Sequence, residues 1–173
     1  MKNTKAIGWL LGAALALTPM ALPAKTTDKP LGDRVRHELV MLPWYSLFDN
    51  ISYQTEGSKV ILTGQVVWPA LKRDAEAAVK HMAGVSEVEN KIEILQPSPN
   101  DDRIRWAELR SVYGSDGLLY YGQGALPSIH IIVKNGHVTL EGVVSRQADK
   151  TLAGVAANMV PGVFSVTNDL QVQ

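Results

Sequence analysis

The residues of this chain best suited to binding lie around position 106. Arg103, Trp106 and Arg110 occupy positions i, i+3 and i+7 of a predicted helix, which places two guanidinium groups and an indole on one stripe. An indole suits a membrane interface because its ring is apolar while its N–H can remain hydrated. Each arginine near an anionic surface contributes about 1 kcal/mol. The spacing predicts weak, salt-sensitive attachment to phospholipid, with Tyr120 and Tyr121 extending the patch.

The same pattern is consistent with a packing role for the tryptophan. Trp106 can instead turn inward with Leu109 and Tyr113 against a sheet, as apolar residues at helical spacing commonly do. This inward orientation is the preferred one from the sequence.

Two histidines raise the question of a metal site. His130 and His137 are predicted to lie on the outward face of one hairpin, about 11 Å apart along the strands. That separation is too large for one ion without further ligands. Both histidines are therefore expected to be solvated strand residues, and no metal ligand set is predicted.

Other chemistry is not indicated. The chain has no Gly-x-Ser-x-Gly segment and no phosphate-binding loop. The neighbouring carboxylates Asp101 and Asp102 fit a helix N-terminus, where the dipole favours negative charge. A fold this small also leaves little room for a deep pocket. We therefore expect no enzyme activity, no cofactor and no small-molecule substrate.

Two stretches of the chain repeat one another at a shift of 78 residues. Residues 60–66 align with 138–144, and Gly84-Val85 aligns with Gly162-Val163. The matching positions are apolar residues and glycines, which determine packing and backbone shape, while the polar positions between them differ. This repetition predicts two copies of one small fold.

Each copy predicts the order helix, strand, strand, helix, strand. Apolar periodicity and breaking residues place these elements in the first copy at 32–42, 49–55, 59–67, 69–82 and 85–95. The same signals in the second copy give 101–113, 129–134, 137–144, 146–159 and 163–172. Asp101 or Asp102 is the predicted N-cap of the first of these helices. The predicted fold class is α+β, with two tandem α-β-β-α-β modules that each have a small three-stranded sheet and two helices on one face.

A proline-rich segment separates the copies. Residues 96–100 contain Pro97 and Pro99 and predict a stiff linker between a domain at 31–95 and a domain at 101–173. The second copy has nine extra residues before its first strand, around positions 114–124. This surplus is either a shaped loop or an elongated helix end.

Six residues that recur in the two copies read as determinants of the fold. Gly64 and Gly142 are expected where a strand bends or another backbone approaches closely. Gly84 and Gly162 are expected to end helices in a left-handed conformation. The third pair is Asn90 and Asn168, polar residues within strand patterns. If buried, they need hydrogen-bond partners, which the neighbouring hairpin could supply.

These residues together resemble the BON domain, an envelope module first described in osmotically induced periplasmic proteins. The resemblance is carried by the hairpin Val-x-Leu-x-Gly at 60–64 and 138–142, the alanine-rich helix, and Gly-Val-x-x-Val-x-Asn at 84–90 and 162–168. It implies an exported protein with a role in stress response. It also implies binding to phospholipid surfaces or envelope components, in some members with a chaperone-like activity.

The N-terminus has the three parts of a secretory signal peptide. Lys2 and Lys5 precede an apolar run at 7–17, which is followed by small residues up to Ala24. As a helix, eleven residues rise about 16 Å, against about 30 Å for a hydrocarbon core. We therefore expect residues 1–24 to be removed, and the protein to be periplasmic or secreted.

Charge and cysteine content narrow the range of partners. Loss of Lys2 and Lys5 changes the formal net charge from 0 to about −2, whereas phosphate-binding proteins usually have a basic excess. Nucleic acid is therefore not an expected partner. The absence of cysteine excludes disulfides, thiolate metal sites and a lipoprotein anchor.

The expected function is that of an exported, non-enzymatic binding protein that contacts the cell envelope, chiefly phospholipid surfaces. The alternative is a periplasmic protein-interaction or holdase module that uses the sheet face away from the helices, where Ile61 and Ile132 are apolar residues at outward positions. A third possibility is a spacer without a ligand of its own.

Overall fold

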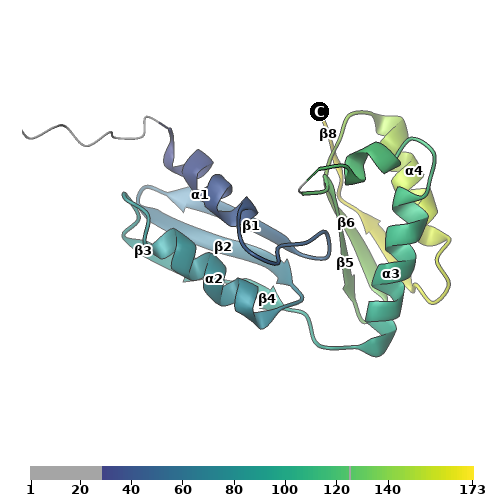
Figure 1. The fold of residues 1–173 in the computed structure, drawn as a ribbon, viewed down its shortest axis with the longest axis horizontal. Helices are drawn as coiled ribbons and strands as arrows, with labels where there is room; N and C mark the ends of the chain where they lie inside the picture. Colours follow the sequence, from purple (N-terminus) through teal and green to yellow (C-terminus); the bar gives the residue numbers. More distant parts are fainter. Residues whose placement is uncertain (1–28, 125) are drawn as a thin grey trace, which may run out of the picture.

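The computed structural model describes residues 29–124 and 126–173, which form two α+β modules in tandem (Figure 1). The predicted signal peptide, residues 1–24, lies outside the described residues. Module 1, residues 31–95, contains α1 (Leu31–Val40), β1 (Asn50–Glu56), β2 (Lys59–Val66), α2 (Pro69–Lys80), β3 (Glu87–Asn90) and β4 (Glu93–Ile94). Module 2, residues 99–173, contains α3 (Pro99–Tyr113), the 3-10 turn η1 (Leu119–Gly122), β5 (Ile129–Lys134), β6 (His137–Val144), α4 (Gln147–Asn158), β7 (Ser165–Asn168) and β8 (Gln171–Val172).

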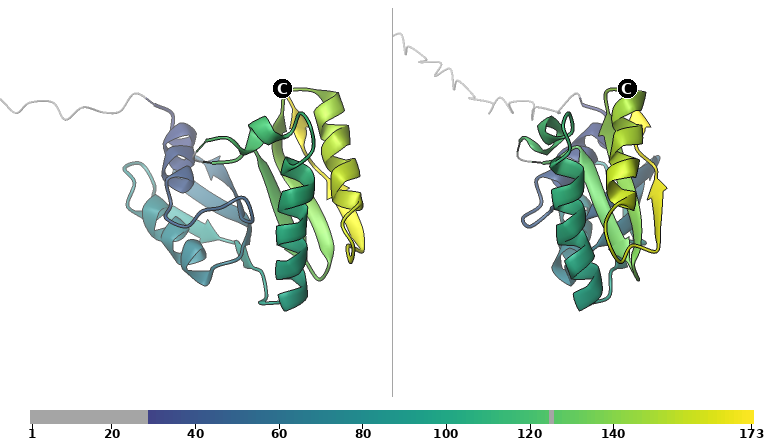
Figure 2. Two further views of the ribbon diagram at one scale, coloured as in Figure 1. Left: turned by 45° about the vertical axis from the view of Figure 1, so that its right-hand side comes forward. Right: turned by 90° about the vertical axis from the view of Figure 1, so that its right-hand side faces the viewer.

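The two sheets have the same topology. In module 1, β2 lies between β1, with which it is antiparallel, and β3 and β4, with which it is parallel. In module 2, β6 has the same relation to β5 and to β7 and β8. Both helices of each module cover one face of its sheet (Figures 1 and 2). The predicted fold class is confirmed, except that the last strand of each copy is interrupted.

Two asparagines at equivalent positions of the two copies explain the interruption. Asn90 donates to the Lys72 carbonyl of α2 at 2.8 Å, and Asn168 donates to the Lys150 carbonyl of α4 at 2.7 Å. Each side-chain oxygen accepts from the N–H two residues later, at Ile92 and Leu170. The amide therefore ties the helix to the broken strand. The predicted partner, the neighbouring hairpin, was wrong.

Two glycine pairs permit close approach in the same way in both modules. Gly64 and Gly142 have φ of +109° and +118°, and a Cβ at these positions would collide with the carbonyls of Asn50 and Ser128. Gly84 and Gly162 also have positive φ, but each lies in the turn after its helix has ended rather than at the helix cap.

The boundaries of the first helices differ from the sequence expectation. α1 ends at Val40, ahead of Pro43, and α3 begins at Pro99, inside the segment predicted to be a linker. Ser98 caps α3 by accepting from the Asp101 N–H at 3.2 Å. Neither Asp101 nor Asp102 is the N-cap. Asp101 instead accepts from the N–H groups of Asn135 and Gly136 at 2.9 and 2.8 Å, and so fixes the β5–β6 turn.

Each module has its own hydrophobic core. In module 1 the core is centred on β2, α1 and α2, whose fully buried side chains include Leu62, Val66 and Leu71. In module 2 it is centred on β5, β6, α3 and α4, with Ile104, Ile131 and Leu140 fully buried. Two separate cores are expected if the chain consists of two units that each bury one face of a sheet.

Glu108 on α3 is a buried carboxylic acid of module 2. Its side chain is fully buried, and neither carboxyl oxygen has a hydrogen-bond partner within the part of the chain that the structure describes. Burial raises the pKa of the Glu108 carboxyl to about 8, because an apolar environment disfavours the charged form. Glu108 is therefore protonated at neutral pH.

We predict a pH-dependent stability that originates at this residue. Between the ordinary pKa of 4.5 and the folded value of about 8, the native state holds a proton that the unfolded state has lost. The free energy of unfolding should then fall as pH rises, by up to about 1.4 kcal/mol per pH unit. The free energy of unfolding of the wild type and of Glu108→Gln can be measured by urea denaturation at pH 5, 6, 7 and 8. It should fall less steeply with pH in the variant than in the wild type. Equal slopes would contradict the assignment.

Candidate functional site

Residues 41–49, here called the joining segment, connect α1 to β1 and reach across to module 2 (Figure 1). Asp49 organises this segment from a fully buried position. One of its carboxylate oxygens accepts from the N–H and hydroxyl of Ser46 at 3.0 and 2.7 Å, and the other accepts from the Val67 N–H at 2.7 Å. The segment is thereby fastened to the end of β2.

The joining segment docks on the β5 edge of module 2. The Leu47 carbonyl accepts from the Ile131 N–H at 2.7 Å, and the side chains of Leu47 and Phe48 pack against the core of module 2. Lys134 and Glu93 form a further contact between the modules at 2.6 Å, although both side chains are about half exposed and such pairs contribute little. The main attachment is therefore a backbone hydrogen bond and apolar packing.

Two side chains of β5 that were expected to face solvent are buried. His130 is only 8% exposed, and the centroid of its ring lies 5.7 Å from that of Tyr45. Its Nδ1 has no partner among the described residues. Burial lowers the pKa of His130, and the nearby Asp49 opposes that shift. Ile132 is 4% exposed. The predictions of a solvated His130 and an exposed Ile132 were wrong, because both side chains are buried, His130 with Tyr45 of module 1 against its ring.

Three tryptophans remain exposed, and we call Trp44, Trp68 and Trp106 the aromatic face. Trp44 is 82% exposed and Trp68 is 62% exposed, and both line an apolar groove of about 360 Å³ together with Leu71. Trp106 is 55% exposed and lies edge-on to Phe48, with ring centroids 5.3 Å apart. The preferred inward orientation of Trp106 was therefore wrong.

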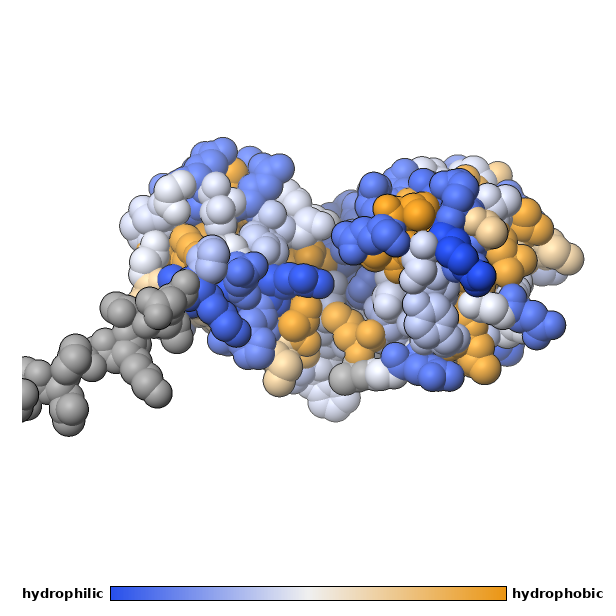
Figure 3. All heavy atoms as spheres, turned by 90° about the horizontal axis from the view of Figure 1, so that it is seen from above, coloured by the Kyte–Doolittle hydropathy of each residue, from blue (hydrophilic) through white to orange (hydrophobic). Residues whose placement is uncertain are grey.

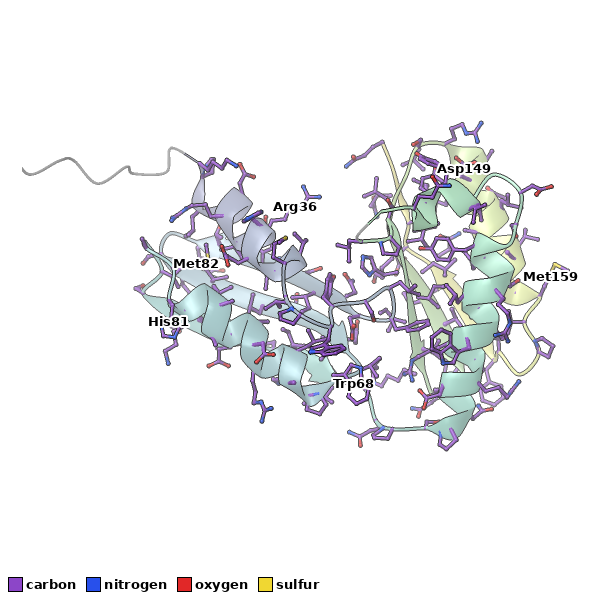
Figure 4. The ribbon with its side chains drawn as sticks, viewed as in Figure 1. Arg36, Trp68, His81, Met82, Asp149 and Met159 are labelled. Atoms are coloured by element: carbon purple, nitrogen blue, oxygen red, sulfur yellow. The ribbon has the colours of Figure 1, made fainter. Side chains whose placement is uncertain are left out.

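The elements that carry these rings lie near the boundary between the modules. The joining segment and the start of α2 lie at this boundary in Figure 1, and α3 lies in module 2 across from them. Trp68, labelled in Figure 4, lies at the lower boundary between the modules, towards the N-terminal end of α3. Phe48 links Trp44 to Trp106, because it belongs to the same segment as Trp44 and its ring contacts that of Trp106.

The two arginines of the predicted stripe have different environments. Arg103 is exposed, but its guanidinium donates to Asn100 Oδ1 at 3.1 Å and to the Pro161 carbonyl at 3.4 Å. In module 1, Arg34 donates to the Ala83 carbonyl in the same way. The arginine at this position of the first helix thus hydrogen-bonds to a backbone carbonyl in both copies. Arg110 is also exposed, and the described residues offer it no ion pair or hydrogen bond through its side chain.

The two tyrosines of the insert differ in their exposure to solvent. Tyr120 is 57% exposed, whereas Tyr121 is 3% exposed. The Tyr121 hydroxyl donates to Asp149 at 2.7 Å and accepts from the Ser145 N–H at 2.8 Å, so Tyr121 holds η1 on the start of α4. Its predicted place in a surface patch was wrong. The insert is a shaped loop that contains η1, and α3 ends at Tyr113.

Sequence reasoning did not identify Trp44 and Trp68. Both are outside the regular apolar patterns and adjoin a proline, Pro43 or Pro69. Trp68 is the N-cap of α2, and the equivalent position of α4 is occupied by Arg146. One sequence signal could have identified Trp68 as an exposed residue: it is a large aromatic residue before a helix, and the second copy has a charged residue, Arg146, at the same position.

Over residues 29–124 and 126–173, no helix combines the length and the apolar character needed to cross a bilayer. Within those residues, no cluster of three or more histidine, aspartate or glutamate side chains could hold a metal ion.

Comparison with solved structures gives weak global likenesses. The C-terminal domain of CdsD, titled the structural protein of the type III secretion system of Chlamydia trachomatis, covers 87% of this chain and 100% of its own at 13% identity and a TM-score of 0.32. A second CdsD structure covers 82% of this chain and 91% of its own at 11% identity and a TM-score of 0.31.

Sequence comparison is more informative. Osmotically-inducible protein Y of Escherichia coli (strain K12) is 29% identical over 130 residues, which is 70% of this chain. The chain spans only 61% of the length of that relative. The BON domain signature matches residues 27–96 and again residues 102–173. The chain therefore belongs to the BON domain family, with two copies of the domain in tandem.

Proposed function

We propose that this protein is an exported, non-enzymatic BON protein that makes reversible contact with anionic phospholipid surfaces through its aromatic face. The name of its Escherichia coli relative and the family support a role in the envelope under osmotic stress, with a periplasmic location. The observation that carries the proposal is the exposure of Trp44, Trp68 and Trp106, of which the first two line one groove and the third contacts Phe48 of the joining segment.

Trp44 and Trp68 form a contiguous exposed apolar surface, since both line one groove. Apolar patches of this kind in monomeric proteins usually mark interaction sites. The groove between Trp44 and Trp68 is lined mainly by apolar atoms, with Asp74 as its only charged residue among those described. An indole inserted at the headgroup level buries its ring and keeps its N–H hydrated.

The backbone at Trp44 supports the same conclusion. Trp44 has φ +67°, a left-handed conformation that bulky residues rarely adopt and that costs on the order of 1–3 kcal/mol. The strain places an aromatic ring in solvent, where it makes little contribution to packing. Strained residues of this kind concentrate at functional sites.

Electrostatic attraction adds to the insertion of the rings. Arg110 has no side-chain partner among the residues that the structure describes, while Arg103 also contributes to the fold. One arginine near an anionic surface contributes about 1 kcal/mol. Attachment should therefore be weak, reversible and reduced by salt.

The alternative holdase role loses the surface first suggested for it. Ile132 is buried, and Ile61 is half-buried next to a charged network in which Lys59 pairs with Glu87 and Glu89 at 3.1 and 2.9 Å. The sheet face of module 1 away from its helices is thus largely polar.

Vesicle sedimentation tests the proposal. The wild type should co-sediment with vesicles of 30% phosphatidylglycerol and less with pure phosphatidylcholine, and 0.5 M salt should weaken the binding. The triple variant Trp44→Ser, Trp68→Ser, Trp106→Ser should lose about a hundredfold in partitioning, since each of the three rings contributes on the order of 1 kcal/mol. Arg110→Gln should lose about fivefold.

Met159→Ser provides a matched control for these variants. Met159 is 75% exposed at the end of α4, on the side of module 2 away from module 1 (Figure 4). Its replacement removes an exposed apolar side chain outside the aromatic face and should leave partitioning unchanged. Equal binding of the triple variant and the wild type would overturn the proposal.

A second prediction separates function from stability at Trp44. Trp44→Asn relieves backbone strain, because asparagine tolerates the left-handed region, and it removes little buried area. The free energy of unfolding in urea should stay constant or rise by about 1 kcal/mol, while vesicle binding falls. A loss of stability of more than about 1 kcal/mol would show that the ring has a packing role instead.

A further inference from the structure

The outer edge of β1 is an unused row of backbone hydrogen-bonding groups. The Gly57-Ser58 turn closes the hairpin on the hydrogen-bonded pair Glu56 and Lys59. Every second residue of β1 therefore bonds to β2, and the backbone N–H and C=O groups of the residues between them point away from β2. The outward residues are Ile51, Tyr53 and Thr55. Of their N–H and C=O groups, the Ile51 N–H alone has a partner within the described residues, the Tyr45 hydroxyl at 3.3 Å.

The equivalent edge in module 2 is closed. Ile129, Ile131 and Val133 are its outward residues by the same register. The Ile129 carbonyl accepts from the Tyr113 hydroxyl, and the Val133 carbonyl accepts from Arg105 at 2.7 Å. The Ile131 N–H donates to the carbonyl of Leu47, so a backbone segment of this chain is already seated on the edge. The edge of β5 therefore shows what occupies such an edge in this fold.

A cleft of about 610 Å³ borders the open edge of β1. Four consecutive residues, Asn50 to Tyr53, line it. Consecutive residues of a strand alternate between the two faces, so the cleft borders the edge of β1 rather than one face. Its other walls are α1, Tyr45, and residues 126–128, 130 and 142–143 of module 2. The volume lies in the range of pockets that hold ligands, and boundaries between domains are common places for them.

The walls of the cleft are mixed in character. Val40 and Val143 are 38% and 37% exposed, and Leu126 lies near them, so apolar contacts are available from both modules. Apolar side chains are exposed on both sides of the module boundary when the molecule is seen from above (Figure 3). Arg36 extends from α1 toward the boundary and supplies a positive charge at the cleft (Figure 4).

We propose that this cleft binds an extended polypeptide segment, which adds as a strand to the outer edge of β1. Backbone groups of the segment would pair with those of Tyr53 and Thr55 and with the Ile51 carbonyl, and alternate apolar side chains would contact Val40 and Val143. Strand addition of this kind obtains its affinity from main-chain hydrogen bonds and its selectivity from pockets for alternate side chains. The site is separate from the aromatic face.

The first test uses the full chain and a capped synthetic hexapeptide, Lys-Val-Thr-Val-Thr-Val, without lipid. Amide hydrogen exchange measured by NMR should slow at Tyr53 and Thr55 when the peptide is added. Ser52 and Gln54, which already bond to β2, should change much less. The same peptide with every backbone nitrogen methylated keeps its side chains and loses its donors, and its affinity should fall about tenfold or more.

A pair of variants tests the edge itself. Tyr53→Pro removes the outward N–H without removing a β1–β2 hydrogen bond, a position where edge strands tolerate proline. Tyr53→Val removes the same ring and retains the N–H. Peptide binding should be lost in Tyr53→Pro and kept in Tyr53→Val. The Trp44, Trp68 and Trp106 triple variant should bind the peptide like the wild type, which separates this inference from the membrane proposal.

Three results would overturn the inference. Exchange at Tyr53 and Thr55 that is unaffected by millimolar peptide would exclude strand addition at β1. Equal binding of the methylated peptide would show that main-chain donors are not used. Protection that appears at β5 or at the aromatic face instead would place the site elsewhere. Should Tyr53→Pro not fold, the exchange measurement on the wild type still decides.

Discussion

The docking of the joining segment on β5 is the contact on which the rest of the structure depends. One backbone hydrogen bond, from Ile131 to Leu47, and the packing of Leu47 and Phe48 hold the two modules together. The same nine residues carry Trp44 and support Trp106 through Phe48. They also carry Tyr45, which lines the cleft beside β1 and covers His130. Both candidate surfaces therefore require this segment to stay in place.

The two copies share their internal geometry and differ in what they leave open. In each, an asparagine joins the last strand to the second helix, and a first-helix arginine binds the carbonyl ahead of a left-handed glycine. Module 2 closes the edge of its first strand with Arg105, Tyr113 and a segment of module 1. Module 1 leaves that edge open. Duplication preserved the contacts that make the fold, while the edges and surfaces diverged.

The fold could be predicted from the sequence to a large extent because it is encoded locally. The Asn135-Gly136 turn, the alternation in β6 and the apolar stripe of α2 each identify one element without knowledge of the others. The repeated glycine and asparagine positions then indicated two copies. The partners of Asn90 could not be predicted, because they depend on how the helix lies over the sheet.

The candidate site was predicted less well, since exposure depends on contacts between modules. His130 follows an outward strand pattern and is nevertheless buried, with Tyr45 of module 1 against its ring. Trp106 has the spacing of a core residue, yet it stays at the surface, where Phe48 meets its edge. Trp44 and Trp68 belong to no periodic pattern, so periodicity alone does not assign them.

Quenching of tryptophan fluorescence by brominated phospholipids measures insertion of the aromatic face most directly. Three proteins would each keep one of Trp44, Trp68 and Trp106, with the remaining tryptophans replaced by phenylalanine. On anionic vesicles the account predicts quenching of all three indoles to a similar depth near the headgroups. Binding to vesicles without quenching at any of the three, or quenching of one indole alone, would contradict a shared membrane-facing surface.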